Sequence, residues 1–256
     1  MLAYLFTILT LLSFSGEKSI KFKGDNAKIE IRLAGNLKIA PVKGKTLTIS
    51  YTIPDSLTRY FSIEKENNKV RIAFTDSFKI KNLKHLKELR DTLEFRIEMP
   101  EEVILDLEVG GGLLRNEMEL GGLKLKSFTL EYGAGTAHVK FSKPNNIVME
   151  QFEVSAGASK IEIYKLGNAN FTKGEINCGV SSVTIDLGGK WKEKAALYIS
   201  SGLASINLKA PRDLAFNVIK EGVLNPGLGE IKTKNPKFTI YFEGAINALN
   251  YEVYEK

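Results

Sequence analysis

The sequence is poor in the residues that build covalent cross-links and metal sites. It contains one cysteine, Cys178, and two histidines, His85 and His138. One thiol cannot form an intramolecular disulfide, so core packing and strand pairing must hold the fold. Two isolated histidines, with no cysteine or carboxylate cluster near them, lack the ligand spacing of a zinc site. We therefore expect no metal site and no cofactor, and we interpret both histidines as surface or edge residues.

The chain also lacks a recognisable catalytic set. The glycines at 110–112 are not followed by Gly-Lys-Ser/Thr, so they indicate a turn rather than a phosphate-binding loop. Neither histidine is close enough in sequence to Cys178 to act as its base, and we interpret this cysteine as a small buried residue. The carboxylates show no recurrent acidic row, because these four are scattered over three predicted strands: Asp106, Glu108, Glu162 and Asp186. No residue is predicted to be catalytic.

Apolar residues nowhere form a run long enough to cross a bilayer, which takes about 20 residues in a helix. The apolar run from Leu2 to Phe14 is shorter, and no charged side chain occurs before Glu17. The triplet Ser13-Phe14-Ser15 has the small-x-small form of a cleavage site, so we predict a signal peptide over residues 1–15, cut before Gly16. A retained anchor and a buried first strand are the alternatives. The predicted location is extracytoplasmic: secreted, periplasmic or at the cell surface.

Acidic residues are scarce in the N-terminal part of the chain. The net charge is +6, and residues 17–98 hold 18 Lys and Arg against 11 Asp and Glu, a balance of +7. In an exported protein, such a surface would suit an anionic envelope polymer, an envelope protein or a membrane surface, and not nucleic acid. The alternative is a solvated lysine-rich surface that only keeps the protein soluble.

Alternating apolar and polar residues predict strands throughout residues 16–100. The clearest runs are 27–33, 35–39, 46–53 and 92–100, the last closed by Pro100. Asn67 and Asn68 separate two further runs and predict a hairpin turn, since Asn tolerates a positive φ.

One segment, at about residues 77–91, has the pattern of a basic amphipathic helix instead. Apolar side chains recur at every third position from Ile80 to Leu89. The basic side chains around them are candidates for contact with an anionic surface: Lys79, Lys81, Lys84, Lys87 and Arg90. A lid that packs its leucines on the end of the β-structure is the structural alternative.

Glycine-centred units recur through the C-terminal part, residues 101–256. The anchor glycines are Gly135, Gly157, Gly179 and Gly202, spaced by 22, 22 and 23 residues, with a weaker copy at Gly112. Such a period predicts stacked repeats. We expect each glycine to occupy a bend between two short strands, where a positive φ or a close approach to the next coil excludes a Cβ.

Apolar residues recur at fixed offsets from these glycines. Position +4 is Val139, Ile161, Val183 and Ile206, and position +6 is also apolar in each unit, whereas position +5 is polar in each unit. Positions +4 and +6 lie on one face of a strand, so stacking would bury matching aliphatic rows. The asparagines 145, 146, 168 and 170 fall at equivalent corners, where they predict a side-chain ladder or, alternatively, a row of ligand-binding groups.

Together these motifs resemble the toastrack family of exported or membrane-tethered β-repeat domains. The likeness rests on Gly35-Asn-Leu-Lys-Ile39, the strand Leu93 to Pro100, the run Leu105 to Val109, and the units ending at Gly135 and Gly157. It implies an all-β, β-solenoid-like stack of repeats of about 22 residues, here with one short inserted helix, and a non-catalytic role in adhesion, assembly or envelope-stress sensing. The serious alternative is a β-helical enzyme that acts on an envelope polysaccharide.

The basic segment generates a direct test. Replacing Lys79, Lys81, Lys84 and Lys87 with Glu reverses its charge, so the variant should no longer sediment with anionic vesicles that the parent binds. Equal sedimentation of parent and variant, or none by the parent, would contradict the membrane contact.

Overall fold

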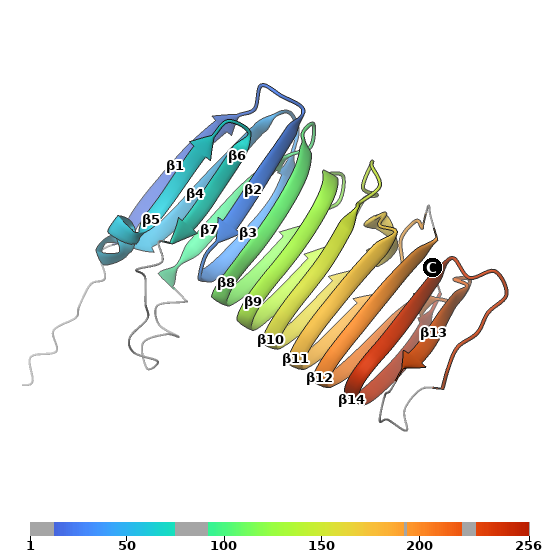
Figure 1. The fold of residues 1–256 in the computed structure, drawn as a ribbon. Helices are drawn as coiled ribbons and strands as arrows, with labels where there is room; N and C mark the ends of the chain where they lie inside the picture. The colour runs from blue at the N-terminus through green and yellow to red at the C-terminus, as the bar shows by residue number, and fades with distance from the viewer. Residues whose placement is uncertain (1–12, 75–91, 192–193, 222–228, 256) are drawn as a thin grey trace, which may run out of the picture.

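The computed structural model describes residues 13–74, 92–191, 194–221 and 229–255, which form one 14-stranded sheet folded into a long stack (Figure 1). The strands are β1 (Ser13–Lys21), β2 (Asn26–Arg32), β3 (Gly35–Val42), β4 (Thr46–Pro54), β5 (Phe61–Glu66), β6 (Lys69–Phe74), β7 (Glu94–Pro100), β8 (Ile104–Glu119), β9 (Lys124–Lys140), β10 (Gln151–Tyr164), β11 (Lys173–Asp186), β12 (Ala195–Pro211), β13 (Phe216–Glu221) and β14 (Phe238–Tyr254). Two 3-10 turns, η1 (Asp55–Tyr60) and η3 (Leu166–Asn168), accompany them. None of the described helical segments is long and apolar enough to cross a membrane.

Each long strand has two arms that meet at a corner. In β10, Phe152, Val154 and Ala156 are buried, whereas beyond Gly157 the buried residues are Ile161 and Ile163. The inward side therefore changes from even to odd positions at residues 157–160, which means that the strand turns around the core there. The inward side also switches between even and odd positions in β8, β9, β11 and β12. The predicted bend is present, but inside one continuous strand of 14 to 17 residues rather than between two short ones.

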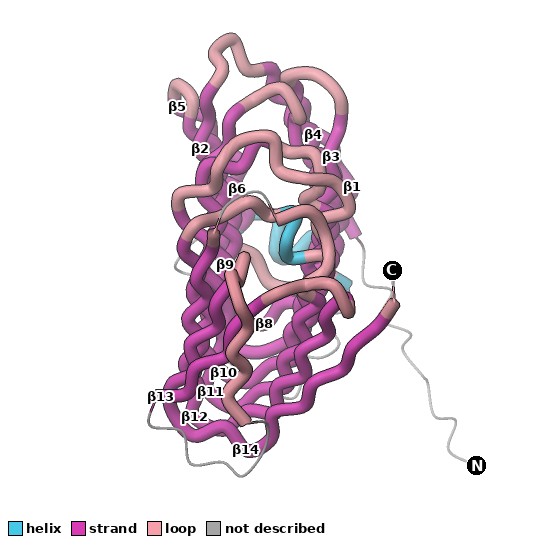
Figure 2. Tube along the Cα trace, turned by 90° about the vertical axis from the view of Figure 1, so that its right-hand side faces the viewer, coloured by secondary structure: helices cyan, strands magenta, loops and turns pink. Residues whose placement is uncertain are grey.

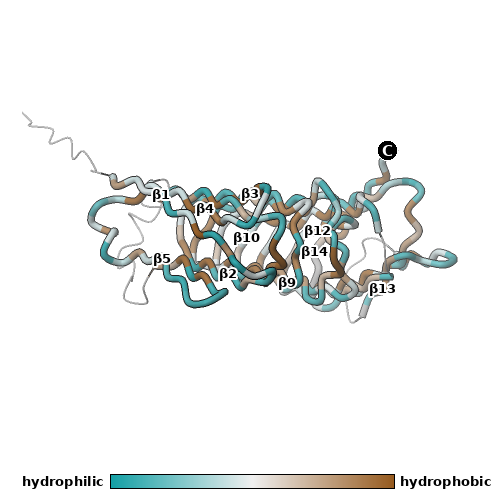
Figure 3. The backbone as a smooth tube through the Cα atoms, turned by 90° about the horizontal axis from the view of Figure 1, so that it is seen from above, coloured by the Kyte–Doolittle hydropathy of each residue, from teal (hydrophilic) through white to brown (hydrophobic). Residues whose placement is uncertain are grey.

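The arms build two walls that face each other across the core. The first wall contains β5, β6 and β2, then the first arms of β8 to β12 and β14, and finally β13. The second wall contains β1, β4, β7 and β3, then the second arms of β8 to β12 and β14. Figure 3 shows β1, β4 and β3 along one side and β5, β2 and β13 along the other, and the end view in Figure 2 shows the two columns of strands.

The core lies between the walls, and the aliphatic rows fill it. The residues at +4 and +6 are fully buried, as predicted, including Val139, Ile161 and Val183. An aromatic column adds to them, with the rings of Phe152 and Phe171 stacked 5.1 Å apart. Burying each large apolar side chain contributes roughly 1.5–3 kcal/mol before conformational entropy is counted.

One register assignment from the sequence is wrong. Ala156 pairs with Tyr132 and Ala158 pairs with Ala134, so Gly157 lies opposite Gly133 and not opposite Gly135. The corner column is therefore Gly112, Gly133, Gly157, Gly179 and Gly202. A shift of two residues keeps every side chain on its face of the strand, which is why the predicted burial holds although Val139 lies opposite Ile163.

Position 157 requires glycine because the backbone of the neighbouring coil lies very close, and not because φ is positive. A Cβ there would lie 2.5 Å from the carbonyl oxygen of Gly133, and at Gly179 it would lie 2.7 Å from that of Gly157. Gly135 has a different requirement, with a φ of 140°. Each coil thus packs its backbone directly on the backbone of the coil below.

The coil that starts at Gly112 is irregular at Asn116, as its sequence indicates. Asn116 takes an inward position between Leu114 and Met118 and is fully buried. Neither Nδ2 nor Oδ1 of this side chain has a hydrogen-bond partner in the described parts of the chain.

Both ends of the stack depart from sequential order. β14 lies between β12 and β13, although β13 precedes it in the chain. At the other end, β5 and β6 form the predicted hairpin, with Asn67 at φ 52°. The N-terminal region, 16–100, and the repeat region, 101–256, share one sheet through β2 and β3, which both pair with β8.

The first strand bears on the predicted signal peptide. β1 begins at Ser13, and Ser13, Phe14 and Ser15 pair with Pro54, Ile53 and Thr52. A cut before Gly16 would remove these three paired residues and leave the rest of β1 in the sheet. Residues 1–12 lie outside the described part of the chain.

The basic segment with Lys79, Lys81, Lys84, Lys87 and Arg90 also lies outside the described residues. It connects β6 on the first wall to β7 on the second wall. The C-terminal end of β6 and the N-terminal end of β7 therefore lie where the other coils turn from the first wall to the second.

The corner geometry predicts the effect of a single methyl group. Gly157→Ala should lower the free energy of unfolding by about 1–3 kcal/mol, because the new Cβ forces the neighbouring backbone to move. Gly112→Ala is the matched control, since a Cβ at Gly112 would meet no atom within 4 Å. Urea unfolding of both variants measures the difference, and equal midpoints would show that the corner contact is wrong.

Candidate functional site

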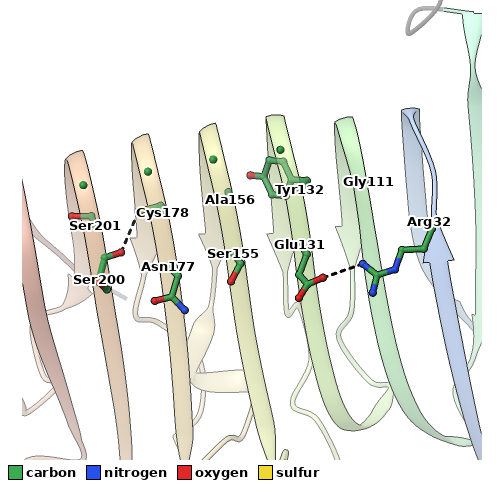
Figure 4. Close-up of a pocket in the computed structure, with 14 residues that line it drawn as sticks. Arg32, Gly111, Glu131, Tyr132, Ser155, Ala156, Asn177, Cys178, Ser200 and Ser201 are labelled. Atoms are coloured by element: carbon green, nitrogen blue, oxygen red, sulfur yellow. Dashed lines mark hydrogen bonds and ion pairs between the residues drawn. The ribbon is translucent and has the colours of Figure 1, made fainter. Parts of the chain in front are cut away.

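A shallow groove of about 750 Å³ runs along the outside of the glycine corner and crosses the coils (Figure 4). The glycines leave its floor without side chains, and one wall is a row of outward residues, one from each coil: Glu131, Ser155, Asn177 and Ser200. These residues pair in register across β9, β10, β11 and β12. We call this feature the corner groove.

The corner groove carries charge at one end only. Arg32 from β2 places Nη1 3.0 Å from Oε2 of Glu131 and Nη2 3.7 Å from a carboxylate oxygen of Glu108. Beyond this pair the wall is neutral: Ser155 donates to Glu153 at 3.3 Å, and Asn177 and Ser200 follow. Serine and asparagine side chains both donate and accept hydrogen bonds, so this wall suits a neutral polar ligand.

The residues before the glycines are uncharged as well. They are Tyr132, Ala156, Cys178 and Ser201, which occupy the same register position in four coils. Burial raises the pKa of Tyr132 to about 12 and also raises the pKa of the Cys178 thiol. Cys178 is buried, as predicted, and its Sγ lies 3.8 Å from the Ser200 carbonyl oxygen. The Oγ of Ser201 is buried without a hydrogen-bond partner in the described residues.

On the far side of the glycines, the corner presents apolar side chains to solvent. Ala158 pairs with Val180, and Val180 pairs with Leu203. Val180 is 63% exposed and Leu203 is 51% exposed. The corner therefore offers a polar row and an apolar row, separated by bare backbone.

The sequence contained a signal for this groove. All four wall residues precede a corner glycine by two positions, but the choice of Gly135 in place of Gly133 hides Glu131 from the pattern. Among the described residues, none of the asparagines that the sequence offered as ligand-binding groups lines the groove, whereas the predicted turn glycines Gly157, Gly179 and Gly202 do.

A second depression, of about 700 Å³, lies on the outer face of the second wall, over β1, β4, β7, β3 and β8. Its charged residues have both signs, and some are paired, as Lys38 is with Glu117 at 3.3 Å. Arg96 also bonds outside the depression, to Glu98 at 3.2 Å. The depression is thus balanced in charge and lacks the repetition of the corner groove.

The prediction that the carboxylates form no recurrent acidic row is wrong for the first wall. Glu30, Glu108, Glu153 and Glu175 fall on one outward row of the first wall, which is interrupted at Thr129. Cations pair with three of these carboxylates: Lys69 lies 3.1 Å from Glu30, Lys28 contacts Glu108, and Lys173 lies 2.7 Å from Glu175. In the part of the chain that the structure describes, no three His, Cys, Asp or Glu side chains are grouped to hold a metal ion.

The asparagines at the loop corners form structural bonds. Asn145 accepts from the Leu125 N–H at 2.9 Å and donates to its carbonyl oxygen at 2.8 Å. Asn168 donates to the Phe141 carbonyl, and Asn170 donates to that of Ile147. These three are buried and bond to the backbone of neighbouring coils, whereas Asn146 is exposed. The predicted ladder of asparagine side chains is therefore replaced by bonds from side chain to backbone.

His138 lies on the outer face of the second wall, as a surface histidine. Its Nδ1 is 2.6 Å from Oε2 of Glu162, whose side chain is only 15% exposed. Glu162 also accepts from Lys160 at 2.7 Å and from the Tyr164 hydroxyl at 2.9 Å. The hydrogen bond from Lys160, with those from Tyr164 and the charge of His138, holds the pKa of Glu162 below its ordinary value.

Comparison with known proteins supports the fold family. Residues 144–209 match the model of the N-terminal domain of toast_rack, DUF2154, which confirms the resemblance to the toastrack family over these coils. No curated protein matches the chain in sequence.

Solved structures that are similar to this chain include the following two. One is a candidate cell adhesion protein from Clostridium sporogenes, 14% identical, with a TM-score of 0.45 over 95% of this chain and 100% of that chain. The other is a candidate adhesin from Bacteroides fragilis, 13% identical, with a TM-score of 0.47 over 93% of this chain and 97% of that chain.

The bonds of Glu162 predict a pH-dependent contribution to stability. A carboxylate whose folded pKa is lowered stabilises the fold above its ordinary value, about 4.3, and the stabilisation is lost as the pH falls through the folded pKa. Glu162→Gln should therefore lose roughly 0.5–1.5 kcal/mol at pH 7 and approach the parent in stability at low pH.

The control for this prediction is Glu117→Gln, because Glu117 is 57% exposed and is paired only with Lys38 among the described residues. Thermal unfolding between pH 3 and pH 7 measures both variants. A loss in Glu162→Gln that is the same at every pH would contradict the role of its charge.

Proposed function

We propose that this chain is a non-catalytic binding module of the cell envelope, and that the corner groove holds an extended polymer laid along the stack. The observation that carries the proposal is the in-register repetition of one neutral polar side chain per coil at Ser155, Asn177 and Ser200. Neighbouring strands lie about 4.8 Å apart, so the groups repeat at that interval along a straight line.

The two sides of the corner favour a glycan chain over a charged polymer. A sugar ring presents hydroxyl groups at its edge and C–H groups on its faces. The hydroxyls match the donors and acceptors of the polar row, and the C–H faces match the exposed side chains of Val180 and Leu203. The Arg32–Glu131 pair closes the N-terminal end of the groove with balanced charge. A neutral envelope polysaccharide is thus the partner we propose.

The basic segment extends this proposal toward the membrane or an anionic polymer. It is inserted between β6 and β7, which neighbour β2 and β3 in the two walls. Lys79, Lys81, Lys84, Lys87 and Arg90 lie outside the described residues, but the strands that flank them, β6 and β7, belong to the N-terminal end of the stack. An extracytoplasmic location, proposed from the apolar N-terminus and the toastrack match, would place both surfaces among envelope components, in adhesion, assembly or stress sensing.

Filling the groove tests the proposal. Asn177→Trp should weaken binding to neutral β-linked glucan or chitin oligosaccharides at least tenfold, because the indole occupies the polar row. Asn207→Trp is the matched control, since Asn207 faces outward on the second wall, away from the groove. Titration calorimetry with both variants and the parent measures the change.

Two outcomes would overturn this function. Equal weakening by both tryptophan variants, or no binding of any neutral glycan by the parent, would remove the groove as the site. Release of reducing ends from the oligosaccharides would favour the alternative, a β-helical enzyme that acts on an envelope polysaccharide.

A further inference from the structure

The two ends of the stack are stepped in opposite senses. Below β8, the second wall continues through β3, β7, β4 and β1, whereas the first wall continues only through β2, β6 and β5. Above β12, both walls contain β14, and only the first wall continues, to β13 (Figure 1). Each end therefore has one wall that projects by one strand and one that is recessed by one strand, and the projecting wall at one end is the recessed wall at the other.

The two outermost strands of the second wall run in the same direction. β1 is antiparallel to β4, and β4 is antiparallel to β7. β7 is parallel to β3, β3 is parallel to β8, and every pair from β8 through β12 to β14 is parallel. A copy stacked on the end of another would thus present β1 parallel to β14 and continue the sheet without a reversal.

The unpaired backbone groups at these two edges are complementary. Tyr254 accepts from the Arg212 N–H through its carbonyl oxygen, so its backbone faces β12. Backbone groups alternate along a strand, and those of Leu249, Tyr251 and Val253 therefore face the open edge. Within the described residues, no strand pairs with that side of the second arm of β14.

The edge of β1 has the opposite alternation. Phe22 donates its N–H to Lys45, so even positions in β1 face β4, and Ser15, Glu17 and Ser19 face away. If β1 of a second copy lay beside β14, the backbone groups of the inward residues of β14 would therefore face the backbone groups of the outward residues of β1. The same relation joins neighbouring coils inside the stack, as where inward Leu187 donates to outward Lys209.

The side chains at the two edges leave apolar surface uncovered. Val253 belongs to an inward row of the second wall, yet it is 45% exposed. At the other edge Phe14, which a cut before Gly16 would remove, is 48% exposed. The outward row that begins with Glu17, Ser50 and Arg96 ends on its tenth strand, at Asn250. Continuing that row into a second copy sets Glu17 beside Asn250 and Ile20 beside Val253, which covers the exposed valine.

We propose that copies of this chain stack head to tail, with β1 of one copy extending the second wall of the next at β14. The recess beside β5 receives the projecting β13. The outer edge of β13 already exchanges both backbone bonds with Ile231 at Val218, so the second wall makes the joint. The contact is between two different surfaces and does not close, so it generates a filament. An open edge of this kind is otherwise a hazard for uncontrolled pairing.

Engineered cysteines test the register. The double variant Glu17→Cys with Asn250→Cys should give a ladder of disulfide-linked multimers on oxidation, because adjacent strands hold Cα atoms at a distance that a disulfide spans. The native Cys178 is buried. The control double variant Glu17→Cys with Val180→Cys should give no ladder, since Val180 is at the corner. Equal ladders from both pairs, or none from the first pair, would overturn the proposal.

Blocked edges test the polarity. Val253→Pro removes an N–H from the tail edge, and Glu17→Pro removes one from the head edge, while neither takes part in the existing ladder. Light scattering should show multimers for the parent, monomers for each variant, and dimers but nothing longer for an equal mixture of the two.

Circular dichroism checks that the proline variants are folded. Two lysine substitutions then repeat the test of the tail edge without proline. Val253→Lys should dissociate the multimers, whereas Val180→Lys, at a valine that is more exposed (63% against 45%), should not. A parent that stays monomeric at millimolar concentration, or multimers that survive every edge variant, would show that the ends do not join.

Discussion

Direct stacking of backbone on backbone at the glycine corner is the constraint from which the rest of the structure follows. The oxygen of Gly133 approaches so closely below Gly157 that no side chain fits between the coils. This approach lets consecutive strands turn the same corner in register, and register in turn lays Ile161, Val183 and Ile206 on top of one another. Without it the two walls could not share one core.

The same constraint creates the candidate site. A column of residues without side chains leaves a channel on the outside of the corner, and register sets one polar residue beside it in each coil. Recognition in such a groove comes from repetition rather than from an enclosed pocket. A partner with its own linear repeat can use several weak contacts together, which matches the neutral, polar character of Ser155, Asn177 and Ser200.

A stack of this kind always has two ends, and the edge strands at these ends differ between the two walls in how far their backbone groups are bonded. On the first wall, Ile231 bonds to β13, and Lys18 of β1 donates to the carbonyl oxygen of Ile63 in β5. These contacts satisfy some of the backbone groups at the two ends of the first wall. The second wall keeps the alternation of its strands up to both edges, so the geometry that joins coils within one chain is available between chains.

The sequence by itself determined the all-β class, the inward rows and the presence of a repeated glycine bend, because period-two patterns and glycine spacing depend on residues close together in the chain. It did not determine which glycine of Tyr132-Gly-Ala-Gly135 lies in the column, since a shift of two residues preserves every face. It also could not show that β14 lies between β12 and β13, that Glu30, Glu108 and Glu153 share one row, or that the wall residues line one groove. Only the tertiary structure decided these, because pairing between strands is set by contacts across the whole stack rather than by any local pattern.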